Sequence, residues 1–455
     1  MRQAGPRRRT PPPPPPPRDC PGSTCGGSVP TAPDLLADLE WRGLVAHSTD
    51  REALRSAFAE GGVRFYVGFD PTAPSLHMGN LLQLVTARRL QDAGHTPHLL
   101  VGGATGLIGD PRDSGERTLN PVETVHAWVE RLRAQIEPFL RFEGENAATM
   151  VNNFDWTQPM SVLDFLRDVG KHFPVNRMLA RDVVRTRLED GISFTEFSYV
   201  LLQSMDFLEL YRSRGVTLQF GGSDQWGNLT GGVELVRRAE AAQVHAFATP
   251  LITKADGTKY GKSEGGALWL DAEMMSPYAF HQFWLNVEDE KVGELLRVFT
   301  FLSHEQIEQI EAAHAEKPWA RAGQRRLADE VTAFVHGSEA VDRATAAAAA
   351  LFGGDGEALH ALDGPTLAAA LRDAGSIEVA REDGSVPAVL DLLVASGLCS
   401  SKAEARRTVK EGGAYVNHAR VEDPEHRPED SALLADGWLV LRRGKKRMAG
   451  VRVVD

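Results

Sequence analysis

Residues 65–80 read FYVGFDPTAPSLHMGN. The run Phe65–Phe69 is apolar apart from one glycine and predicts a buried β-strand, whereas the amphipathic run Leu81–Ala93 predicts a helix. The turn between them therefore lies at the carboxyl end of a strand, where open α/β sheets bind their ligands. A helix N-terminus at that point offers free N–H groups to a phosphate, so the stretch predicts a nucleotide site.

Strand-like and helix-like runs alternate from about Asp34 to Asp271, with further strands at His98–Gly102 and Thr217–Phe220 and a helix at Pro121–Phe139. This alternation predicts an α/β fold whose parallel, Rossmann-like sheet carries helices on its faces. We expect four segments: a disordered Pro-rich tail at 1–30, the Rossmann-like domain at 31–275, an α-helical domain at 276–380, and a small α+β domain at 386–455. Glu382–Ser385 has the composition of a linker.

The bulk composition is that of an ordinary globular protein, with 42% hydrophobic and 25% charged residues and a net charge of −12. No run of about 18 apolar residues predicts a membrane span. Three cysteines, Cys20, Cys25 and Cys399, provide neither a disulfide framework nor a zinc ligand set. These features favour the reducing cytoplasm and exclude a membrane partner.

Two short segments carry groups suited to phosphate chemistry. His77 and Asn80 are donors for phosphoryl oxygens, and Gly79 lets a nucleotide approach the backbone. Residues 259–263 read KYGKS, and their two lysines suit the charge that develops on a leaving pyrophosphate. Two alternatives for this second segment are a Walker A loop, whose glycines are spaced one residue too closely here, and a solvated basic loop.

A third segment, Ser193–Tyr211, predicts a helix that begins with a capping box at Ser193–Glu196. Tyr199, Gln203 and Asp206 follow at i, i+4 and i+7, so they lie on one face of this mostly apolar helix. Three convergent polar groups predict half of a small-molecule site. The structural alternative is that Asp206 pairs with a nearby arginine.

The C-terminal region is locally basic on an acidic chain, because residues 386–455 contain 12 Lys and Arg against 10 Asp and Glu. A capping box at Ser401–Glu404 predicts a helix that carries Arg406, Arg407 and Lys410. Such a module suits local contact with RNA, although a generic small α+β domain has similar caps and turns.

These segments, with GGSDQWGN at residues 221–228 between them, occur in the order found in class I aminoacyl-tRNA synthetases. The chain resembles tyrosyl-tRNA synthetases of the bacterial type from about Asp34 onward, and its C-terminal region resembles the S4 RNA-binding fold. Two features depart from the family pattern. Asn80 stands where histidine is usual, and residues 111–117 lack the lysine often found there.

The resemblance implies a tyrosine–tRNA ligase that joins L-tyrosine and ATP into tyrosyl-adenylate, releases pyrophosphate, and transfers the tyrosyl group to the 3′ end of tRNA(Tyr). It also implies a homodimer, Mg²⁺ that accompanies ATP, and neither a tightly bound cofactor nor a protein metal cage. The implied tyrosine-binding residues are Tyr66, Asp110, Tyr199, Gln203, Asp206 and Gln225. Those implied in catalysis are Thr72, His77, Asn80, Lys259, Lys262 and Ser263. ATP would further contact Asp70, Gly79, Gly222, Asp224 and Lys262, and RNA would contact Arg406, Arg407 and Lys410.

Two other classes of protein remain as alternatives. A catalytically silent RNA-binding relative predicts a ruined ATP site, yet His77, Lys259 and Lys262 are all present. A P-loop ATPase predicts ATP hydrolysis that needs no tyrosine and depends on Lys262.

Overall fold

The computed structural model describes residues 34–111, 119–258, 260, 267–354, 356–444 and 447–454. The predicted Pro-rich tail lies outside these residues. The chain divides into two compact units. The first extends to Leu270 and includes Gly293–Ile307, and the second comprises Asp271–Val292 and the chain from Glu308 onward.

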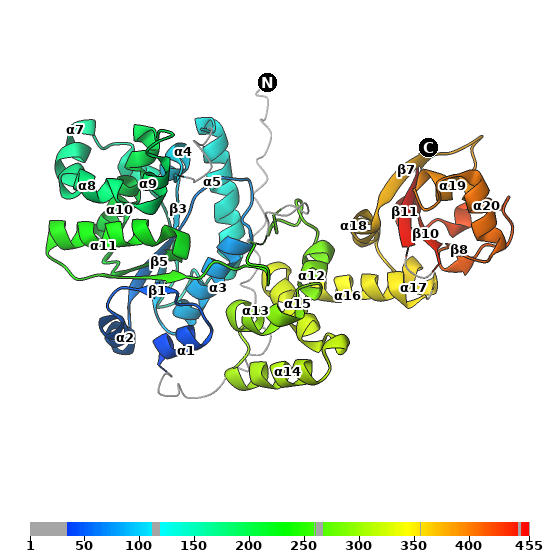
Figure 1. The fold of residues 1–455 in the computed structure, drawn as a ribbon, viewed down its shortest axis with the longest axis horizontal. Coiled ribbons are helices and arrows are strands. Elements are labelled where there is room, and N and C mark those ends of the chain that lie inside the picture. Colours follow the sequence, from blue (N-terminus) through cyan, green and yellow to red (C-terminus); the bar gives the residue numbers. More distant parts are fainter. Residues whose placement is uncertain are drawn as a thin grey trace, which may run out of the picture. The chain divides into compact units, whose positions relative to one another are not determined.

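The first unit is built on a six-stranded sheet with the order β1-β6-β5-β2-β3-β4 (Figure 1). Its strands are β1 (His47–Ser48), β2 (Arg64–Phe69), β3 (Thr96–Val101), β4 (Thr149–Asn152), β5 (Leu218–Gly222) and β6 (His245–Thr249). Every pair is parallel except β1 with β6. The chain runs outward from β2 to β3 and β4 and then returns to the other side of β2 as β5. This reversal creates a topological switch point at the carboxyl ends of β2 and β5, where such sheets bind ligands.

Helices lie on both faces of this sheet in Figure 1. The helices of the first unit are α1 (Leu35–Trp41), α2 (Arg51–Glu60), α3 (Met78–Asp92), α4 (Thr105–Ile108), α5 (Val122–Ile136), α6 (Phe154–Thr157), α7 (Val162–Asp164), α8 (Val175–Leu179), α9 (Asp182–Arg187), α10 (Phe194–Arg214), α11 (Trp226–Glu240) and nearly all of α13 (Val292–Phe299). Helix α14 (His304–Glu316) begins in the first unit and ends in the second.

The helix predicted at Leu81–Ala93 begins earlier, at Met78, because its N-terminus is capped by His77 and Asn80. The imidazole Nδ1 of His77 accepts a hydrogen bond from the Gly79 N–H at 3.1 Å, and Oδ1 of Asn80 accepts from the His77 N–H at 3.0 Å. This reciprocal pair is a capping box, and it fixes both side chains at the start of α3.

Neither of the two predicted capping boxes is complete. Ser193 and Ser401 each accept from the backbone N–H three residues later, as predicted. Glu196, however, bonds to Arg187 instead of its cap residue, and Glu404 bonds to the N–H of Ser400. In the folded chain, both glutamate side chains therefore form hydrogen bonds with other partners than their cap residues.

The second unit combines helices with a five-stranded sheet of order β7-β11-β10-β8-β9. Its helices are α12 (Pro277–Leu285), α15 (Ala322–His336), α16 (Ser338–Gly353), α17 (Gly356–His360), α18 (Gly364–Ala374), α19 (Val389–Ala395) and α20 (Lys402–Lys410). Its strands are β7 (Ser376–Ala380), β8 (Ala414–Val416), β9 (Ala419–Arg420), β10 (Trp438–Arg443) and β11 (Arg447–Val454).

One hydrophobic cluster in this unit joins helical residues such as Ala347 and Leu371 to Trp438 and Val440 of β10. The regions that we predicted as two domains therefore share a core. Strand β7, which falls inside the range predicted for the helical domain, pairs with β11. The predicted linker Glu382–Ser385 is a tight turn that is closed by a β-bridge.

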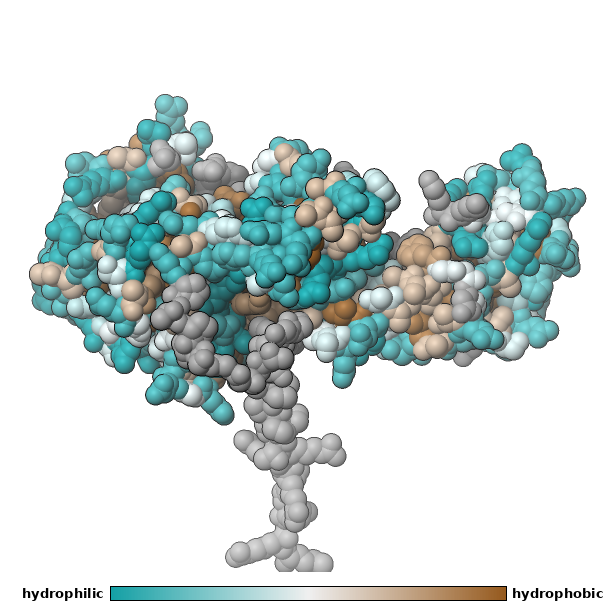
Figure 2. Space-filling view, turned by 90° about the horizontal axis from the view of Figure 1, so that it is seen from below, coloured by the Kyte–Doolittle hydropathy of each residue, from teal (hydrophilic) through white to brown (hydrophobic). Residues whose placement is uncertain are grey.

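None of the described helices is long and apolar enough to cross a membrane. The face of the molecule in Figure 2 is mostly hydrophilic, with apolar residues in small groups.

Candidate active site

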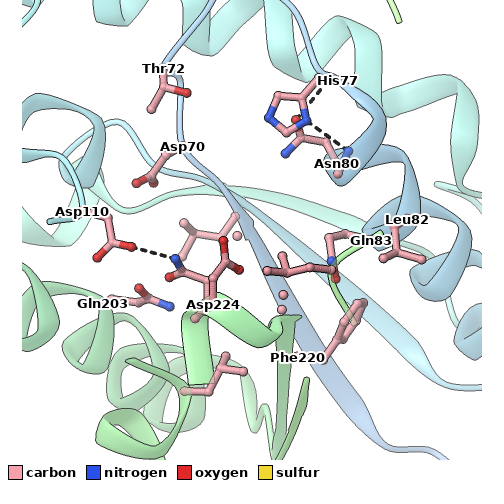
Figure 3. A pocket seen from close by; sticks show the side chains of 18 of the residues that line it. Asp70, Thr72, His77, Asn80, Leu82, Gln83, Asp110, Gln203, Phe220 and Asp224 are labelled. Carbon is pink, nitrogen blue, oxygen red and sulfur yellow. Dashed lines mark hydrogen bonds between the residues drawn. The ribbon is translucent and has the colours of Figure 1, made fainter. Parts of the chain in front are cut away.

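A pocket of about 500 Å³ opens at the switch point between β2 and β5. Its walls come from the carboxyl ends of these strands, the N-terminus of α3, one face of α10, and the segments around Asp110 and Pro250. The predicted residues that line it are Tyr66, Asp70, Thr72, His77, Gly79, Asn80, Asp110, Tyr199, Gln203, Asp206, Gly222, Asp224 and Gln225. Segments far apart in the sequence thus meet at one site, and Figure 3 shows many of their side chains pointing into it.

Lys259, Lys262 and Ser263 lie outside the described residues. Their described neighbours Tyr260 and Ala267 line the same pocket. The N–H of Met78 also donates to the Leu268 carbonyl, and the N–H of Leu270 donates to the Leu76 carbonyl. The segment that follows KYGKS is therefore paired to the start of α3.

At the α3 end of the pocket, His77 presents a hydrogen-bond donor. Its Nδ1 accepts from the Gly79 N–H, so in the neutral ring the proton lies on Nε2. Desolvation by the surrounding protein lowers the pKa of His77, which favours the neutral ring. This Nε2–H, together with the free N–H groups of the first turn of α3, suits the binding of phosphoryl oxygens.

At the opposite end, Asp206 on α10 is buried and held by two donors. Nε1 of Trp156 donates to Oδ1 at 2.9 Å, and Nδ2 of Asn153 donates to Oδ2 at 3.1 Å. Burial outweighs these two hydrogen bonds and raises the pKa of Asp206 to about 8. No arginine pairs with Asp206 among the described residues, so the structural alternative offered for this residue does not hold.

Tyr66 lies on β2 beside Asp206, and its hydroxyl has no hydrogen-bond partner among the described residues. Burial and the charge of Asp206 raise the pKa of Tyr66 well above its usual value, so the hydroxyl keeps its proton. The side-chain oxygens of Gln203 and Gln219 are likewise unpartnered within the described chain. Because an unsatisfied buried polar group costs about 1–3 kcal/mol, this cluster indicates a polar ligand.

Between the two ends, Asp70 links three elements. Its Oδ2 accepts from the Tyr199 hydroxyl at 2.6 Å, and its Oδ1 accepts from Oγ1 of Thr105 at 2.6 Å. Gly102 permits this arrangement, since a Cβ there would lie 2.0 Å from Oδ1 of Asp70. Tyr199 and Asp70 were predicted to contact different substrates, and the structure joins them directly.

A second polar group surrounds Asp110. Nε2 of Gln225 donates to Oδ2 of Asp110 at 2.6 Å, and Nδ2 of Asn228 donates to Oδ1 at 3.2 Å. Figure 3 shows Asp110 and Gln203 on the same side of the view, away from Leu82 and Gln83. A carboxylate in this position is suited to bind a cationic group such as an ammonium.

Sequence reasoning missed the lining residue Gln83 and three residues that hold the lining carboxylates Asp206 and Asp110. Asn153 and Trp156 directly follow β4, so the rule that ligands bind at strand ends points to them. Asn228 lies three residues after Gln225, where the 3₁₀-helix η4 (Ser223–Gln225) continues into α11. No sequence signal marks Gln83, whose Nε2 donates to Oγ1 of Thr249 at 2.8 Å.

The predicted RNA-contacting residues lie together on α20 in the second unit. Arg406 is ion-paired with Glu425 at 2.5 Å. Arg407 and Lys410 are exposed and make no ion pair with the described residues. Two free cations therefore remain on this helix.

The family model for class I tRNA synthetases (W and Y) matches residues 59–353, which is more than half of the chain. A tyrosine–tRNA ligase of Streptomyces coelicolor is 60% identical over 92% of this chain and 99% of its own length. The chain belongs to the tyrosyl-tRNA synthetase family. A similar ligase of Kineococcus radiotolerans is 58% identical over the same shares of both chains.

Two further comparisons agree with this family. The model of the SYY-like C-terminal domain of tyrosine–tRNA ligases matches residues 367–451. A C-terminally truncated mitochondrial tyrosyl-tRNA synthetase of Aspergillus nidulans superposes with a TM-score of 0.62 and 31% identity, covering 69% of this chain and 92% of its own. The predicted family and fold class are confirmed. The likeness of the C-terminal region to the S4 fold stays a prediction.

Proposed function

We propose that this chain is a tyrosine–tRNA ligase whose pocket binds L-tyrosine at the α10 end and ATP at the α3 end. The observation that carries this assignment is the buried pair of Tyr66 and Asp206, because a phenol hydroxyl fits between a hydroxyl that lacks a partner and a carboxyl group. The ammonium group of tyrosine would bind among Asp110, Tyr199 and Gln203, with Gln225 near its carboxylate.

In the first step, an oxygen of the tyrosine carboxylate attacks the α-phosphorus of ATP. The new C–O–P linkage forms as the bond from that phosphorus to the pyrophosphate oxygen breaks, so the products are tyrosyl-adenylate and pyrophosphate. The carboxylate is already ionised, and no side chain needs to act as a nucleophile or base. Catalysis therefore depends on positioning and on stabilisation of charge.

Four residues are suited to stabilise this charge. The Nε2–H of His77 and the amide of Asn80 are donors beside the start of α3, where free N–H groups attract phosphate. Lys259 and Lys262 would bind the leaving pyrophosphate, with Ser263 beside them. Thr72, Gly79, Gly222 and Asp224 would complete the nucleotide contacts. Mg²⁺ would arrive with ATP, held mainly by phosphate oxygens.

In the second step, the tyrosyl group passes to the terminal adenosine of tRNA(Tyr). The exposed cations Arg407 and Lys410 on α20 are suited to contact the phosphate backbone of that RNA. We place this reaction in the cytoplasm, in keeping with a chain whose cysteines provide no disulfide framework.

We further propose that the chain forms a homodimer. Large apolar side chains are exposed on the short helices between β4 and α10 and at the start of α10. They are Val162, Leu163, Leu166, Val175, Leu179, Leu188 and Phe194. Clustered exposed apolar residues mark an interaction surface, and a second copy of the chain would cover them.

Amino-acid-dependent ATP–pyrophosphate exchange tests the proposed function, with each of the twenty amino acids supplied separately. We expect exchange with tyrosine alone. Exchange with tryptophan instead would contradict the proposed pocket, and no exchange from a folded sample would favour the silent RNA-binding relative. ATP hydrolysis without any amino acid would favour the P-loop alternative.

A further inference from the structure

An arginine outside the pocket forms a hydrogen bond to one of the polar groups around Asp110. Arg181 lies between α8 and α9, and its Nη2 donates to Oδ1 of Asn228 at 2.5 Å. A guanidinium group only donates hydrogen bonds, so the Asn228 atom that faces it must be the amide oxygen. The amide nitrogen of Asn228 is therefore directed toward the pocket.

The direction of every following hydrogen bond depends on this first one. Nδ2 of Asn228 donates to Oε1 of Gln225 at 2.9 Å and to Oδ1 of Asp110 at 3.2 Å. Since Oε1 of Gln225 is thereby an acceptor, its Nε2 is the atom that donates to Oδ2 of Asp110 at 2.6 Å. If Asn228 turned over, its oxygen would face two other acceptors, Oε1 of Gln225 and the carboxylate of Asp110.

Two electrostatic factors disfavour a cation at the position of Arg181. Its guanidinium lies over Gly227 in the first turn of α11, where the helix dipole disfavours a cation. Burial lowers the pKa of Arg181, although the charge of Asp110 acts in the opposite direction. Arg181 makes no ion pair with any described side chain. A Cβ on Gly227 would lie 2.9 Å from Nη2, so the glycine keeps the space for this contact.

We propose that Arg181 is a positioning residue for the capture of the tyrosine ammonium group. Its guanidinium fixes Asn228, and through Asn228 it fixes Gln225 and Asp110 in the orientation that receives a cation. This inference rests on the proposed function, in which Asp110 binds the ammonium group. Arg181 itself does not line the pocket.

The test compares the binding of two ligands to the full chain and to Arg181→Met, which removes the donors but keeps a long side chain. The ligands are tyrosine and 3-(4-hydroxyphenyl)propionate, which lacks only the ammonium group. Equilibrium dialysis with labelled tyrosine, and competition by the analogue, gives both affinities. We expect Arg181→Met to weaken tyrosine binding about ten-fold or more, as for the loss of a charge-assisted hydrogen bond. Binding of the analogue should weaken much less, because it can lose only the contact of Gln225 with its carboxylate.

Two further variants make the result specific. Gly227→Ala keeps all four polar side chains but displaces the guanidinium, and we expect the same selective loss of tyrosine affinity. Arg177→Met, on the adjacent helix α8, removes a mostly exposed arginine whose guanidinium lies 3.7 Å from Glu234, and it should change neither affinity.

The role of Arg181 would be overturned if Arg181→Met and Gly227→Ala weakened the binding of both ligands equally. It would also be overturned if neither variant changed the affinity for either ligand. Failure of the proposed function has a different signature, because the unchanged chain would then bind no tyrosine at all.

Discussion

The indole N–H of Trp156 and the carboxyl group of Asp206 are joined by a hydrogen bond of 2.9 Å, although 50 residues separate them in the sequence. Asn153 holds the other carboxyl oxygen. These two donors fix the orientation of a buried acid whose pKa is still raised to about 8. A carboxyl group held in this way can form a hydrogen bond with the hydroxyl of a substrate without moving.

The raised pKa of Asp206 makes stability depend on pH. Between its ordinary pKa of 3.8 and about 8, the folded chain binds a proton that the unfolded chain releases. The free energy of unfolding should therefore fall as pH rises from about 5 to about 8, by at most about 1.4 kcal/mol per pH unit from this group. Asp206→Asn removes this contribution. We expect the melting temperature of this variant, relative to that of the unchanged chain, to increase as pH rises. A difference in melting temperature that stays the same at every pH would contradict the pKa shift.

Gly102→Ala tests the junction of Asp70 with Thr105. The added Cβ would lie 2.0 Å from Oδ1 of Asp70 and 2.3 Å from Oγ1 of Thr105, so their hydrogen bond cannot persist. We expect kcat/KM in pyrophosphate exchange to fall on the order of 100-fold, since small displacements of positioned groups have effects of this size. Gly353→Ala, where a Cβ would meet nothing within 4 Å, is the matched control. Full activity of Gly102→Ala would show that this junction is not needed.

Lys262→Ala should slow the formation of tyrosyl-adenylate by about 100-fold, because it removes one charge from the leaving pyrophosphate. Tyrosine affinity should be nearly unaltered, since the role proposed for Lys262 is to bind pyrophosphate and not the phenol or the ammonium group. Single-turnover release of pyrophosphate and equilibrium binding of tyrosine separate the two effects. A large loss of tyrosine binding would contradict the role assigned to this lysine.

Arg407→Ala combined with Lys410→Ala should reduce the charging of tRNA(Tyr) while leaving pyrophosphate exchange unchanged. Both cations are free on α20, whereas Lys402 on the same helix is ion-paired with Asp391, so Lys402→Ala serves as the control. The double variant should also show a weaker dependence of tRNA binding on salt, because fewer counterions are released. Equal loss of charging and exchange would indicate general damage rather than lost RNA contact.

The sequence predicted those parts of the site that local periodicity controls. The spacing of Tyr199, Gln203 and Asp206 placed them on one helix face, and the strand before Asp70 placed the His77 turn at a sheet edge. Both features are present in the structure.

The partners of these residues were not predictable in the same way. Trp156 reaches Asp206 from the short helix α6, and Arg181 reaches Asn228 from the turn between α8 and α9. No local pattern specifies which distant side chain a carboxyl or amide group meets. The shared core of the second unit was missed for the same reason, because the cluster that contains Leu371 and Trp438 joins segments that look independent in the sequence.

The most direct test of the central claim compares tyrosine with phenylalanine in ATP–pyrophosphate exchange, for the unchanged chain and for Asp206→Ala. A site built around the phenol hydroxyl should favour tyrosine strongly, and a discrimination of about 10⁵-fold is the figure known for this enzyme family itself. We predict exchange with tyrosine in the unchanged chain and its loss in Asp206→Ala, with the circular dichroism spectrum preserved. Unchanged tyrosine activation in Asp206→Ala would contradict the assignment of Asp206 as the residue that selects the substrate.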